Sequence, residues 1–400
     1  MKYVVVLADG AADTPVAELN GKTPLEAANK PNIDELARHG EVGMVKTVPE
    51  GLPPGSDVAN LAVFGYDPQK YYTGRSPLEA VSMKVPLELT DTTFRTNIVT
   101  LSDEPNYEDK TMVDYSSDEI STEEARELIK YVNEKLGTDE YEFFGGFSYR
   151  HLMVWHNKKN EFSLTPPHDI SDRVIGEYLP KDETILNLMK KSYDLLKDHP
   201  VNKARIERGL NPANSIWIWG NGTKPNLNTY AERFGIKGAV VSAVDLIKGI
   251  GYCAGLDVID VEGATGNVHT NFEGKAEASV NALKNGSDFV YIHLEAPDEA
   301  GHRHEIDNKV KAIELIDSKI VAPVVEYLKG CGEDYSILVM PDHPTPLATR
   351  THSSAPIPYI LYSSKNPTDS GCTAYTEAEA EKTGVFVEQG HTLINKLLEK

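Results

Sequence analysis

Short runs of apolar, mostly β-branched residues recur along the chain and alternate with segments in which apolar side chains return every three or four positions. The runs include residues 3–8 (YVVVLA), 215–220 (SIWIWG), 335–342 (YSILVMPD) and 357–364 (IPYILYSS). Continuous apolar runs of this kind are typical of strands that are buried on both faces of a parallel sheet. Strands that alternate with helices predict an α/β core with a doubly wound, mostly parallel sheet.

The pattern changes between residues 86 and 181. Strand-like stretches at 94–102 and 148–156 enclose polar, loop-like sequence and one helical segment that begins with a capping box. This pattern predicts a smaller α+β domain of residues 86–181. The domain is inserted into a core domain that consists of residues 1–85 and 182–400.

The charge of the chain argues against nucleic acids and anionic membranes as partners. The net charge is −21, from 40 basic and 61 acidic side chains, whereas nucleic acids and anionic membranes require a basic surface. No apolar run approaches the roughly 20 residues that span a bilayer, and the N-terminus lacks a signal peptide's apolar stretch and cleavage site. The three cysteines, Cys253, Cys331 and Cys372, are far apart, which predicts neither disulfides nor a thiolate metal site. We expect a cytoplasmic protein with no nucleic-acid or membrane partner, and the sequence does not indicate its oligomeric state.

Acidic and imidazole side chains follow several of the apolar runs, at the strand ends where open α/β sheets bind ligands. The six residues are Asp9, Asp298, His302, Asp342, His343 and His352. Each of them alone has an ordinary explanation as a turn residue, a helix-surface contact or a structural histidine. Together they are expected to converge, because the carboxyl ends of parallel strands meet at one edge of a sheet. Carboxylate and imidazole ligands without thiolate suit Mn²⁺, Mg²⁺, Zn²⁺ or Co²⁺.

Residues 53–60 (PPGSDVAN) place a serine at the start of a predicted helix. Taken alone, Ser56 and Asp57 indicate only a helix start, since both residue types are favoured N-caps. Beside a metal centre, the Ser56 hydroxyl becomes a further ligand and a candidate nucleophile. Two ions about 4 Å apart can hold the attacking and leaving oxygens of a phosphoryl transfer. Asn60, one helical turn further on, is a candidate for orienting the transferred phosphate.

These motifs resemble the cofactor-independent (2,3-bisphosphoglycerate-independent) phosphoglycerate mutases of the archaeal type, within the alkaline phosphatase superfamily. The resemblance runs from about residue 3 to residue 362. The stretches that carry it include VVLADGAAD, PPGSDVANLAVFGYDP, YYTGRSPLEA, FRTNIVT, PDEAGH, PDHPTP and THSSAPIPYILY.

The resemblance implies an alkaline-phosphatase-like core that holds two divalent metal ions. Manganese is favoured, with magnesium, zinc and cobalt as alternatives. By family pattern, one ion is held by Asp9, Ser56, Asp342 and His343, and Ser56 is the residue that becomes phosphorylated. The other ion is held by Asp298, His302 and His352, with His302 preferred over His304.

A small phosphorylated substrate needs cationic partners, and arginine suits phosphate and carboxylate because it binds both in a bidentate way. The candidates are Arg75, Arg95 and Arg150, of which the last two lie in apolar strands of the insert, where an unpaired charge is costly. Arg205 and Arg173 are expected to be solvated surface charges. Lys237 is a candidate for positive charge near the phosphate.

The insert also carries candidates for the group that moves a hydroxyl proton, namely His151, His168 and Asp169. The sequence does not choose among them. We therefore expect a glycolytic isomerase that interconverts 3-phosphoglycerate and 2-phosphoglycerate through a phosphoserine at Ser56.

Three alternatives remain open at this point. A homoserine-kinase-like phosphotransferase and a phosphatase can use the same core, and the insert decides which acceptor is used. The chain has no G-x-x-x-x-G-K-[ST] stretch for ATP phosphates. A non-catalytic protein with a structural metal site is disfavoured, since such sites are closed and rich in cysteine and histidine.

Overall fold

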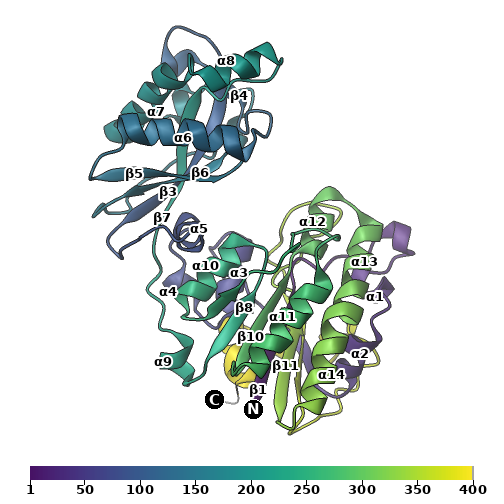
Figure 1. Cartoon of the computed structure of the whole chain (residues 1–400). Coiled ribbons are helices and arrows are strands. Elements are labelled where there is room, and N and C mark those ends of the chain that lie inside the picture. The colour runs from purple at the N-terminus through teal and green to yellow at the C-terminus, as the bar shows by residue number, and fades with distance from the viewer. Residues whose placement is uncertain (399–400) are drawn as a thin grey trace. The chain divides into compact units, whose positions relative to one another are not determined.

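The computed structural model describes residues 1–398 (Figure 1). The chain divides into two compact units. The first unit consists of Met1–Tyr72 and Asn226–Lys400, and the second of Thr73–Pro225.

An eight-stranded sheet forms the centre of the first unit. Its strands, in spatial order, are β13 (Phe386–Val387), β2 (Glu41–Val45), β12 (Ile357–Ser363), β11 (Tyr335–Met340), β1 (Lys2–Ala8), β10 (Phe289–Leu294), β8 (Gly238–Val241) and β9 (Asp257–Ile259). Only β12 runs antiparallel to its neighbours among these described strands. The prediction of a mostly parallel sheet is confirmed.

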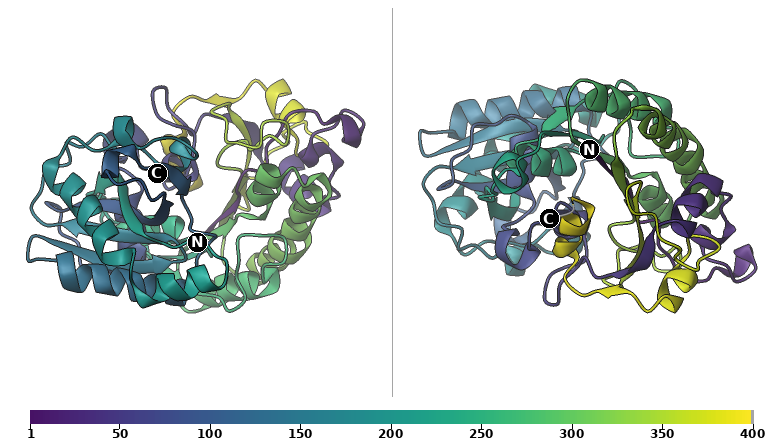
Figure 2. Two further views of the ribbon diagram at one scale, coloured as in Figure 1. Left: turned by 90° about the horizontal axis from the view of Figure 1, so that it is seen from above. Right: turned by 90° about the horizontal axis from the view of Figure 1, so that it is seen from below.

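Helices cover both faces of this sheet. They are α1 (Pro24–Ala27), α2 (Pro31–Arg38), α3 (Ser56–Val63), α4 (Pro68–Tyr71), α9 (Tyr230–Phe234), α10 (Asp245–Cys253), α11 (Phe272–Lys284), α12 (Ala296–Arg303), α13 (Ile306–Ile316), α14 (Ala322–Gly330), α15 (Glu377–Lys382) and α16 (Leu393–Leu397). Short 3₁₀ turns lie at η1 (Ala17–Leu19) and η6 (Gly390–Thr392). Figure 2 shows the green helices of residues 272–330 side by side along one face of the sheet. None of the helices in residues 1–398 has the length and apolar character needed to cross a bilayer.

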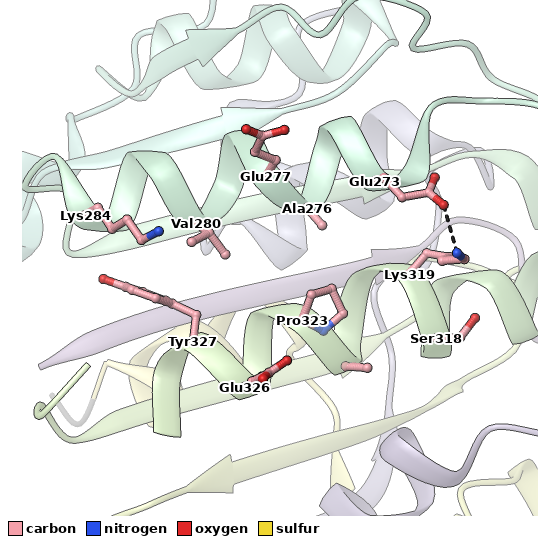
Figure 3. Close-up of a pocket in the computed structure, with 11 residues that line it drawn as sticks. Glu273, Ala276, Glu277, Val280, Lys284, Ser318, Lys319, Pro323, Glu326 and Tyr327 are labelled. Carbon is pink, nitrogen blue, oxygen red and sulfur yellow. Dashed lines mark ion pairs between the residues drawn. The ribbon is translucent and has the colours of Figure 1, made fainter. Parts of the chain in front are cut away.

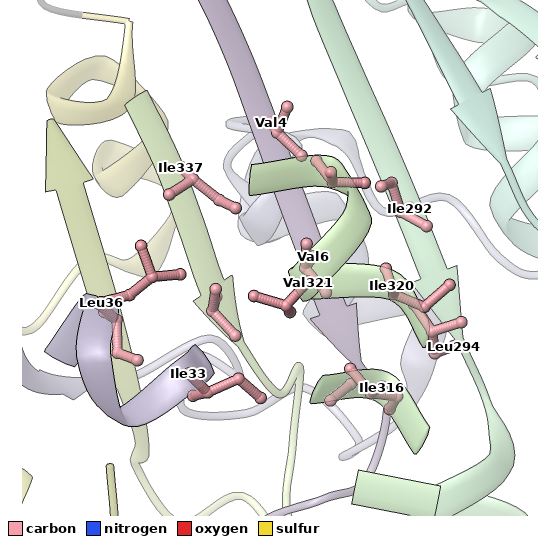
Figure 4. Packing of buried hydrophobic residues seen from close by; sticks show 14 of the residues in the cluster. Val4, Val6, Ile33, Leu36, Ile292, Leu294, Ile316, Ile320, Val321 and Ile337 are labelled. Carbon is pink, nitrogen blue, oxygen red and sulfur yellow. The ribbon is translucent and has the colours of Figure 1, made fainter. Parts of the chain in front are cut away.

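Alternate residues of the central strands explain the two covered faces. On β10, Ile292 points into the apolar core shared with α11, α13 and α14, whereas its neighbour Tyr291 stacks on Phe64 just after α3. Figure 4 shows the first of these cores, and its labelled side chains are Val4, Val6, Ile33, Leu36, Ile292, Leu294, Ile316, Ile320, Val321 and Ile337. Burial on both faces accounts for the continuous apolar runs in the sequence.

One long helical segment of the first unit is interrupted. It consists of α13 and α14, which are joined by the π-helical turn η5 (Asp317–Val321). Pro323 lies in the first turn of α14 and has no N–H to donate to the carbonyl one turn earlier. A π-helical turn ahead of a proline keeps the helix continuous by shifting this hydrogen-bond register.

A groove of about 580 Å³ lies between α11 and the segment formed by η5 and α14 (Figure 3). Val280 and Tyr327 contribute apolar walls, and Lys319 pairs with Glu273 across it at 2.9 Å. No predicted metal ligand lines this groove. It is therefore separate from the site described below.

The second unit is built on a five-stranded antiparallel sheet. Its strands are β3 (Thr92–Leu101), β4 (Met112–Asp114), β5 (Tyr141–Phe147), β6 (Arg150–Trp155) and β7 (Ser215–Thr223). Its helices are α5 (Ser76–Ser82), α6 (Thr122–Leu136), α7 (Glu183–Leu196) and α8 (Pro200–Glu207), with 3₁₀ turns η2 (Tyr107–Asp109), η3 (Pro167–Ile170) and η4 (Gly176–Tyr178). The α+β character of the insert agrees with the sequence pattern.

The inserted unit is larger than predicted, because the expected boundaries near residues 85 and 182 both fall inside it. The apolar run at 215–220 forms a strand, as expected. However, it pairs with β3 in the insert instead of joining the core sheet. α7 packs on β7, and α5 packs on β3 and β7, so both helices belong to the same unit. An apolar run indicates a buried strand but does not reveal its partner, which lies far away in the sequence.

Candidate functional site

Candidate metal ligands converge at the carboxyl edge of the eight-stranded sheet. Two groups have ligand atoms within 4.8 Å of one another, namely Asp9, Asp342 and His343, and Asp298, His343 and His352. His302 lies beside the second group, with its Nε2 3.3 Å from Asp298 Oδ2 and 2.9 Å from His352 Nε2. The structure thus brings together all six of the acidic and imidazole residues singled out at the strand ends.

The backbone of α12 explains why His302 and not His304 joins the cluster. Asp298 and His302 are four residues apart and share one face of the helix. His304 ends the helix in a left-handed conformation, with a φ of 57°, and its Nδ1 lies 2.6 Å from the carbonyl oxygen of Leu347.

The three imidazoles share one orientation, in which Nδ1 faces an oxygen and Nε2 faces the cluster. The oxygen partners of His302, His352 and His343 are, in that order, the Arg350 carbonyl at 2.9 Å, the Pro54 carbonyl at 3.3 Å and the Thr345 hydroxyl at 3.3 Å. An Nδ1–H that donates to such an oxygen leaves the Nε2 lone pair available. This is the usual arrangement of metal-binding histidines.

The carboxylates are crowded and incompletely satisfied. Asp9 Oδ1 is buried and makes no hydrogen bond within residues 1–398, and the nearby His343 Nε2 lies 3.6 Å away. Burial raises the pKa of Asp9 well above its usual value, and the neighbouring charges of Asp342 and Asp298 raise it further. A carboxylate cluster of this kind calls for positive charge in its centre. Hence the donor set and the unsatisfied oxygen fit divalent cations.

At the opposite end of the cluster, hydrogen bonds shift the pKa values of His302 and Asp298 in opposite directions. The hydrogen bond to Asp298 raises the pKa of His302 to about 9. Burial acts to raise the pKa of Asp298, but the hydrogen bonds to His302 and His352 outweigh burial and bring it well below its usual value.

Close backbone approach is needed where β1 ends. Gly10 has a φ of +65°, and a Cβ atom at this position would lie 2.7 Å from the Cα of Asp298. Its N–H donates to Asp342 Oδ1 at 3.1 Å. Glycine therefore allows the loop after β1 to pack directly on two ligand-bearing segments.

Ser56 is the first residue of α3, and its hydroxyl faces the cluster. Gly55 is the N-cap and supplies no side-chain cap, so Ser56 does not have the capping role that its sequence context suggests. Its Oγ lies 3.1 Å from His343 Nε2. Asp57, in the first turn of α3, accepts from the N–H of Val58 and from the hydroxyl of Tyr72.

Asn60 does not have the phosphate-orienting position predicted for it. Its side chain is fully buried, and its amide nitrogen donates to the Ser56 carbonyl at 2.9 Å and to Asp342 Oδ2 at 2.8 Å. Its amide oxygen accepts from the Tyr291 hydroxyl at 2.6 Å. With donors and acceptor engaged, Asn60 can only hold Ser56 and Asp342 in place.

Lys237 is likewise in the wrong place for its predicted role. It directly precedes β8, which runs parallel to β10, and its backbone pairs with Asp288 just before β10. Both residues therefore lie at the amino edge of the sheet. The metal-ligand candidates lie at the carboxyl edge.

In the second unit, the three predicted arginines gather on one side of the antiparallel sheet. Glu79 on α5 links two of them, at 3.3 Å from Arg75 Nε and 3.1 Å from Arg95 Nε. Arg150 lies on the same side because it pairs with Asn97, two residues along β3 from Arg95. Burial lowers the pKa of Arg95, and the charges of Arg75 and Arg150 add to this effect.

An aromatic group supports this arginine face and was not predicted. The Arg95 guanidinium lies over the ring of Trp219 at 4.7 Å, and Trp219 Nε1 donates to Asn97 Oδ1 at 2.9 Å. His168, which is about half exposed, packs edge-on against Trp219 and Tyr115. The carboxylate of Asp169 lies 3.6 Å from His168 Nε2.

His151 does not join this face. It pairs with Thr96 in the sheet, so it points to the side opposite Arg150 and lies in the core of the unit. Its Nδ1 accepts from the N–H of Gly146 at 3.0 Å, and burial lowers its pKa to about 3. A buried, neutral histidine in a core is a structural residue here and not a proton carrier.

Of the two arginines that were expected at the surface, one is exposed and the other is buried. Arg173 is exposed, as predicted. Arg205 is instead buried, with its guanidinium bound by Glu124 Oε2 at 2.7 Å and by the carbonyls of Ser117 and Asn211. It is a structural cation of the second unit.

Several residues next to the ligands escaped prediction. His293 Nε2 lies 2.8 Å from Asp9 Oδ2, and Thr345 donates to Asp298 Oδ1 at 2.5 Å. His293 had a usable signal, since it is an imidazole inside the otherwise apolar run FVYIHL. Thr345 had none, because its role depends on the fold of the loop after β11.

Known proteins resemble the chain over its full length. The family model of 2,3-bisphosphoglycerate-independent phosphoglycerate mutase matches residues 37–202. A probable 2,3-bisphosphoglycerate-independent phosphoglycerate mutase of Geobacter sulfurreducens is 51% identical over 403 residues, covering 100% of both chains. The corresponding mutase of Methanosarcina barkeri is 48% identical over 402 residues, covering 100% of this chain and 99% of the relative.

Solved structures agree with these matches. A protein of Pyrococcus horikoshii superposes with a TM-score of 0.82 at 30% identity, covering 100% of this chain and 97% of the other. A cofactor-independent phosphoglycerate mutase of Thermoplasma acidophilum gives a TM-score of 0.70 at 25% identity, with coverages of 100% and 99%. The chain belongs to the family of 2,3-bisphosphoglycerate-independent phosphoglycerate mutases, in its archaeal-type group.

Proposed function

We propose that the protein interconverts 3-phosphoglycerate and 2-phosphoglycerate by way of a phosphoserine at Ser56. The observation that carries this proposal is the Ser56 hydroxyl at the first position of α3, 3.1 Å from His343 Nε2 at the edge of the ligand cluster. Its relatives of 51% and 48% identity bear the names of phosphoglycerate mutases.

The cluster has the donors to hold two divalent cations. Asp9, Asp342, His343 and Ser56 would hold one of them, and Asp298, His302 and His352 the other. When bound, such ions would neutralise charge on the phosphoryl oxygens and lower the pKa of the Ser56 hydroxyl. The start of α3 adds unsatisfied backbone N–H groups, which favour a phosphorylated side chain at this position.

In the first half-reaction, the Ser56 hydroxyl gives up its proton to solvent and its oxygen forms a bond to phosphorus. The bond between phosphorus and the substrate's C3 oxygen breaks, and this oxygen takes up a proton to give glycerate. Asn60 holds the Ser56 backbone and Asp342 in a fixed relation during this step.

In the second half-reaction, the C2 hydroxyl of glycerate loses its proton and its oxygen forms a bond to the phosphorus of the phosphoserine. The bond from phosphorus to Ser56 Oγ breaks, and Ser56 Oγ takes up a proton. We assign the proton transfer to His168, paired with Asp169, because it is half exposed and packs beside the arginine face. Arg75, Arg95 and Arg150 bind the anionic groups of the substrate.

Replacement of Arg95 by methionine tests the arginine face. Hydrogen bonds to a charged group contribute about 1.5–3 kcal/mol, so we expect the KM for 3-phosphoglycerate to rise roughly 10- to 100-fold. Steady-state kinetics of Arg95→Met measures this change. Arg173→Met is the control, since Arg173 is an exposed arginine of the same unit, and its KM should stay within about twofold. Equal effects of both changes would contradict the assignment.

Variants of His168 and His151 test which of the two histidines transfers the hydroxyl proton. His168→Asn should lower kcat by about 10²- to 10⁴-fold, the usual contribution of a general acid or base. His151→Asn removes a core side chain and should lower the unfolding temperature while the folded protein keeps its kcat. Measurement of both quantities for both variants separates the two roles, and an unchanged kcat in His168→Asn would rule His168 out.

A single assay tests the proposed reaction. The protein is supplied with Mn²⁺ and 3-phosphoglycerate, and formation of 2-phosphoglycerate is followed through enolase. Steady formation of 2-phosphoglycerate supports the mutase. Release of inorganic phosphate as the main product would indicate a phosphatase, and phosphorylation of homoserine from ATP without mutase turnover would indicate a kinase.

A further inference from the structure

A buried ion pair lies behind the ligand cluster and is not used by the proposed reaction. Lys309 on α13 and Asp13 in the loop after β1 meet at 2.7 Å, and both side chains are 0 % exposed. Lys309 Nζ also donates to the carbonyl oxygen of Thr345 at 2.8 Å. Asp13 accepts from the N–H of Leu347 and from the N–H of Thr14.

The pair joins the three chain segments that carry the ligands. Asp13 belongs to the loop that begins with Asp9. Thr345 and Leu347 belong to the loop that begins with Asp342 and His343. Lys309 lies on α13, which packs on α12, the helix of Asp298 and His302.

Contacts of Thr345 extend this connection to the ligands themselves. The Thr345 hydroxyl donates to Asp298 Oδ1 at 2.5 Å and lies 3.3 Å from His343 Nδ1. A Cβ at Gly301 would lie 2.5 Å from the Thr345 carbonyl oxygen, so α12 touches this loop directly. Lys309 donates to that same carbonyl, and it thereby fixes the position of Thr345 relative to Asp298 and His343.

Stability alone does not explain why two charges are kept here. Removing both charges from water has a large free-energy cost. Buried ion pairs can often be replaced by apolar residues without loss of stability. Burial lowers the pKa of Lys309, which shows the same cost. The pair adds directed contacts, since two hydrogen bonds from one nitrogen fix the relative positions of two loops.

We infer that Lys309 and Asp13 are positioning residues of the metal centre, which hold the loops of Asp9 and of Asp342–His343 at the separation that cation binding requires. This inference rests on the proposed function, because it presupposes that the cluster binds divalent cations.

Binding of Mn²⁺ itself provides the test. The chelator-treated, dialysed protein is titrated with Mn²⁺ by isothermal calorimetry, without substrate. Partners behind metal ligands typically change metal affinity 10- to 100-fold. We expect Lys309→Met and Asp13→Asn each to weaken Mn²⁺ binding by at least about tenfold.

A second buried cation offers a matched control. Arg205 in the second unit also bridges a carboxylate and backbone carbonyls, and its side chain is 2 % exposed. Arg205→Met should lower the unfolding temperature and leave the Mn²⁺ affinity within about twofold. The double variant Lys309→Met/Asp13→Asn leaves no unpaired charge, so it should unfold at a higher temperature than Lys309→Met while its Mn²⁺ affinity stays low.

The outcomes are distinguishable. Unchanged Mn²⁺ affinity in folded Lys309→Met, or in Asp13→Asn if the first variant does not fold, overturns the inference and leaves the metal centre intact. Equal loss of affinity in Arg205→Met would overturn it as well, because the effect would then be general destabilisation. Failure of the unaltered protein to bind Mn²⁺ overturns the metal centre and, with it, this inference.

Discussion

Replacement of Ser56 by alanine is expected to abolish phosphoryl transfer. Loss of the nucleophile costs on the order of 10⁶-fold in kcat in enzymes that depend on a serine. The fold should survive, because the Ser56 side chain makes one hydrogen bond, to His343, and Gly55 remains as the N-cap of α3. One such bond contributes about 1 kcal/mol to the free energy of unfolding. The coupled enolase assay and a thermal melt measure the two quantities.

Ser279→Ala is a suitable control for this prediction. Ser279 is a buried serine on α11, and its hydroxyl donates back to the carbonyl of Lys275 within the same helix. Its loss should leave kcat unchanged. Labelled phosphoglycerate gives a second readout, since the protein quenched during turnover should carry phosphoserine at residue 56. A phosphate on another residue, or full activity in Ser56→Ala, would disprove the nucleophile.

Chelation of divalent cations is expected to stop the reaction and to destabilise the protein. Without a cation, the buried carboxylates of Asp9, Asp342 and Asp298 repel one another. Mn²⁺ at about 100 times its dissociation constant would add about 2.7 kcal/mol per site. Thermal melts with and without Mn²⁺ should therefore differ by several degrees.

The variant Asp9→Asn tests the predicted cation site most directly. The substitution removes a buried carboxyl group whose Oδ1 has no hydrogen bond within residues 1–398, and whose charged form is disfavoured by burial and by its acidic neighbours. We expect it to raise the unfolding temperature in chelator and to cancel most of the stabilisation by Mn²⁺, with loss of activity. The two effects have opposite signs, and a general packing defect cannot produce both.

Asp91 provides a control for the substitution of Asp9. It is also buried, but it accepts hydrogen bonds from the N–H groups of Glu88 and Asn157, and it lies 3.2 Å from His156. Asp91→Asn should therefore lower the unfolding temperature and leave the Mn²⁺ effect unchanged. If Asp9→Asn behaves like Asp91→Asn, the carboxylate cluster is not a cation site.

The sequence predicts best what depends on local pattern. The strands β1 and β11 are apolar runs, α3 starts after a proline–glycine turn, and the ligand candidates follow strand ends by position alone. Convergence of these ligands then follows from the rule that parallel strands share a carboxyl edge. No knowledge of side-chain contacts is needed for this step.

The errors concern information that is not local. Arg150 and His151 are neighbours on β6, and a strand sends successive side chains to opposite faces, so only one of them can lie on the arginine face. Sequence does not say which face is which until the partner strands are known. The predicted role of Lys237 was wrong for a related reason. Lys237 precedes its strand, whereas the candidate metal ligands follow the ends of their strands. Asn60 was placed correctly on α3, but its partners Tyr291 and Asp342 come from distant strands.

The order of strands in the eight-stranded sheet has a consequence for synthesis on the ribosome. β1 is the first strand made, yet it lies at the centre of the sheet and pairs with β10 and β11, at residues 289–294 and 335–340. All strands of the second unit, by contrast, have been synthesised by residue 223. The strands of the insert can therefore pair during translation. The apolar β1, by contrast, has no partner strand until most of the chain has been synthesised. Aggregation through this unpaired strand is the hazard of such an arrangement.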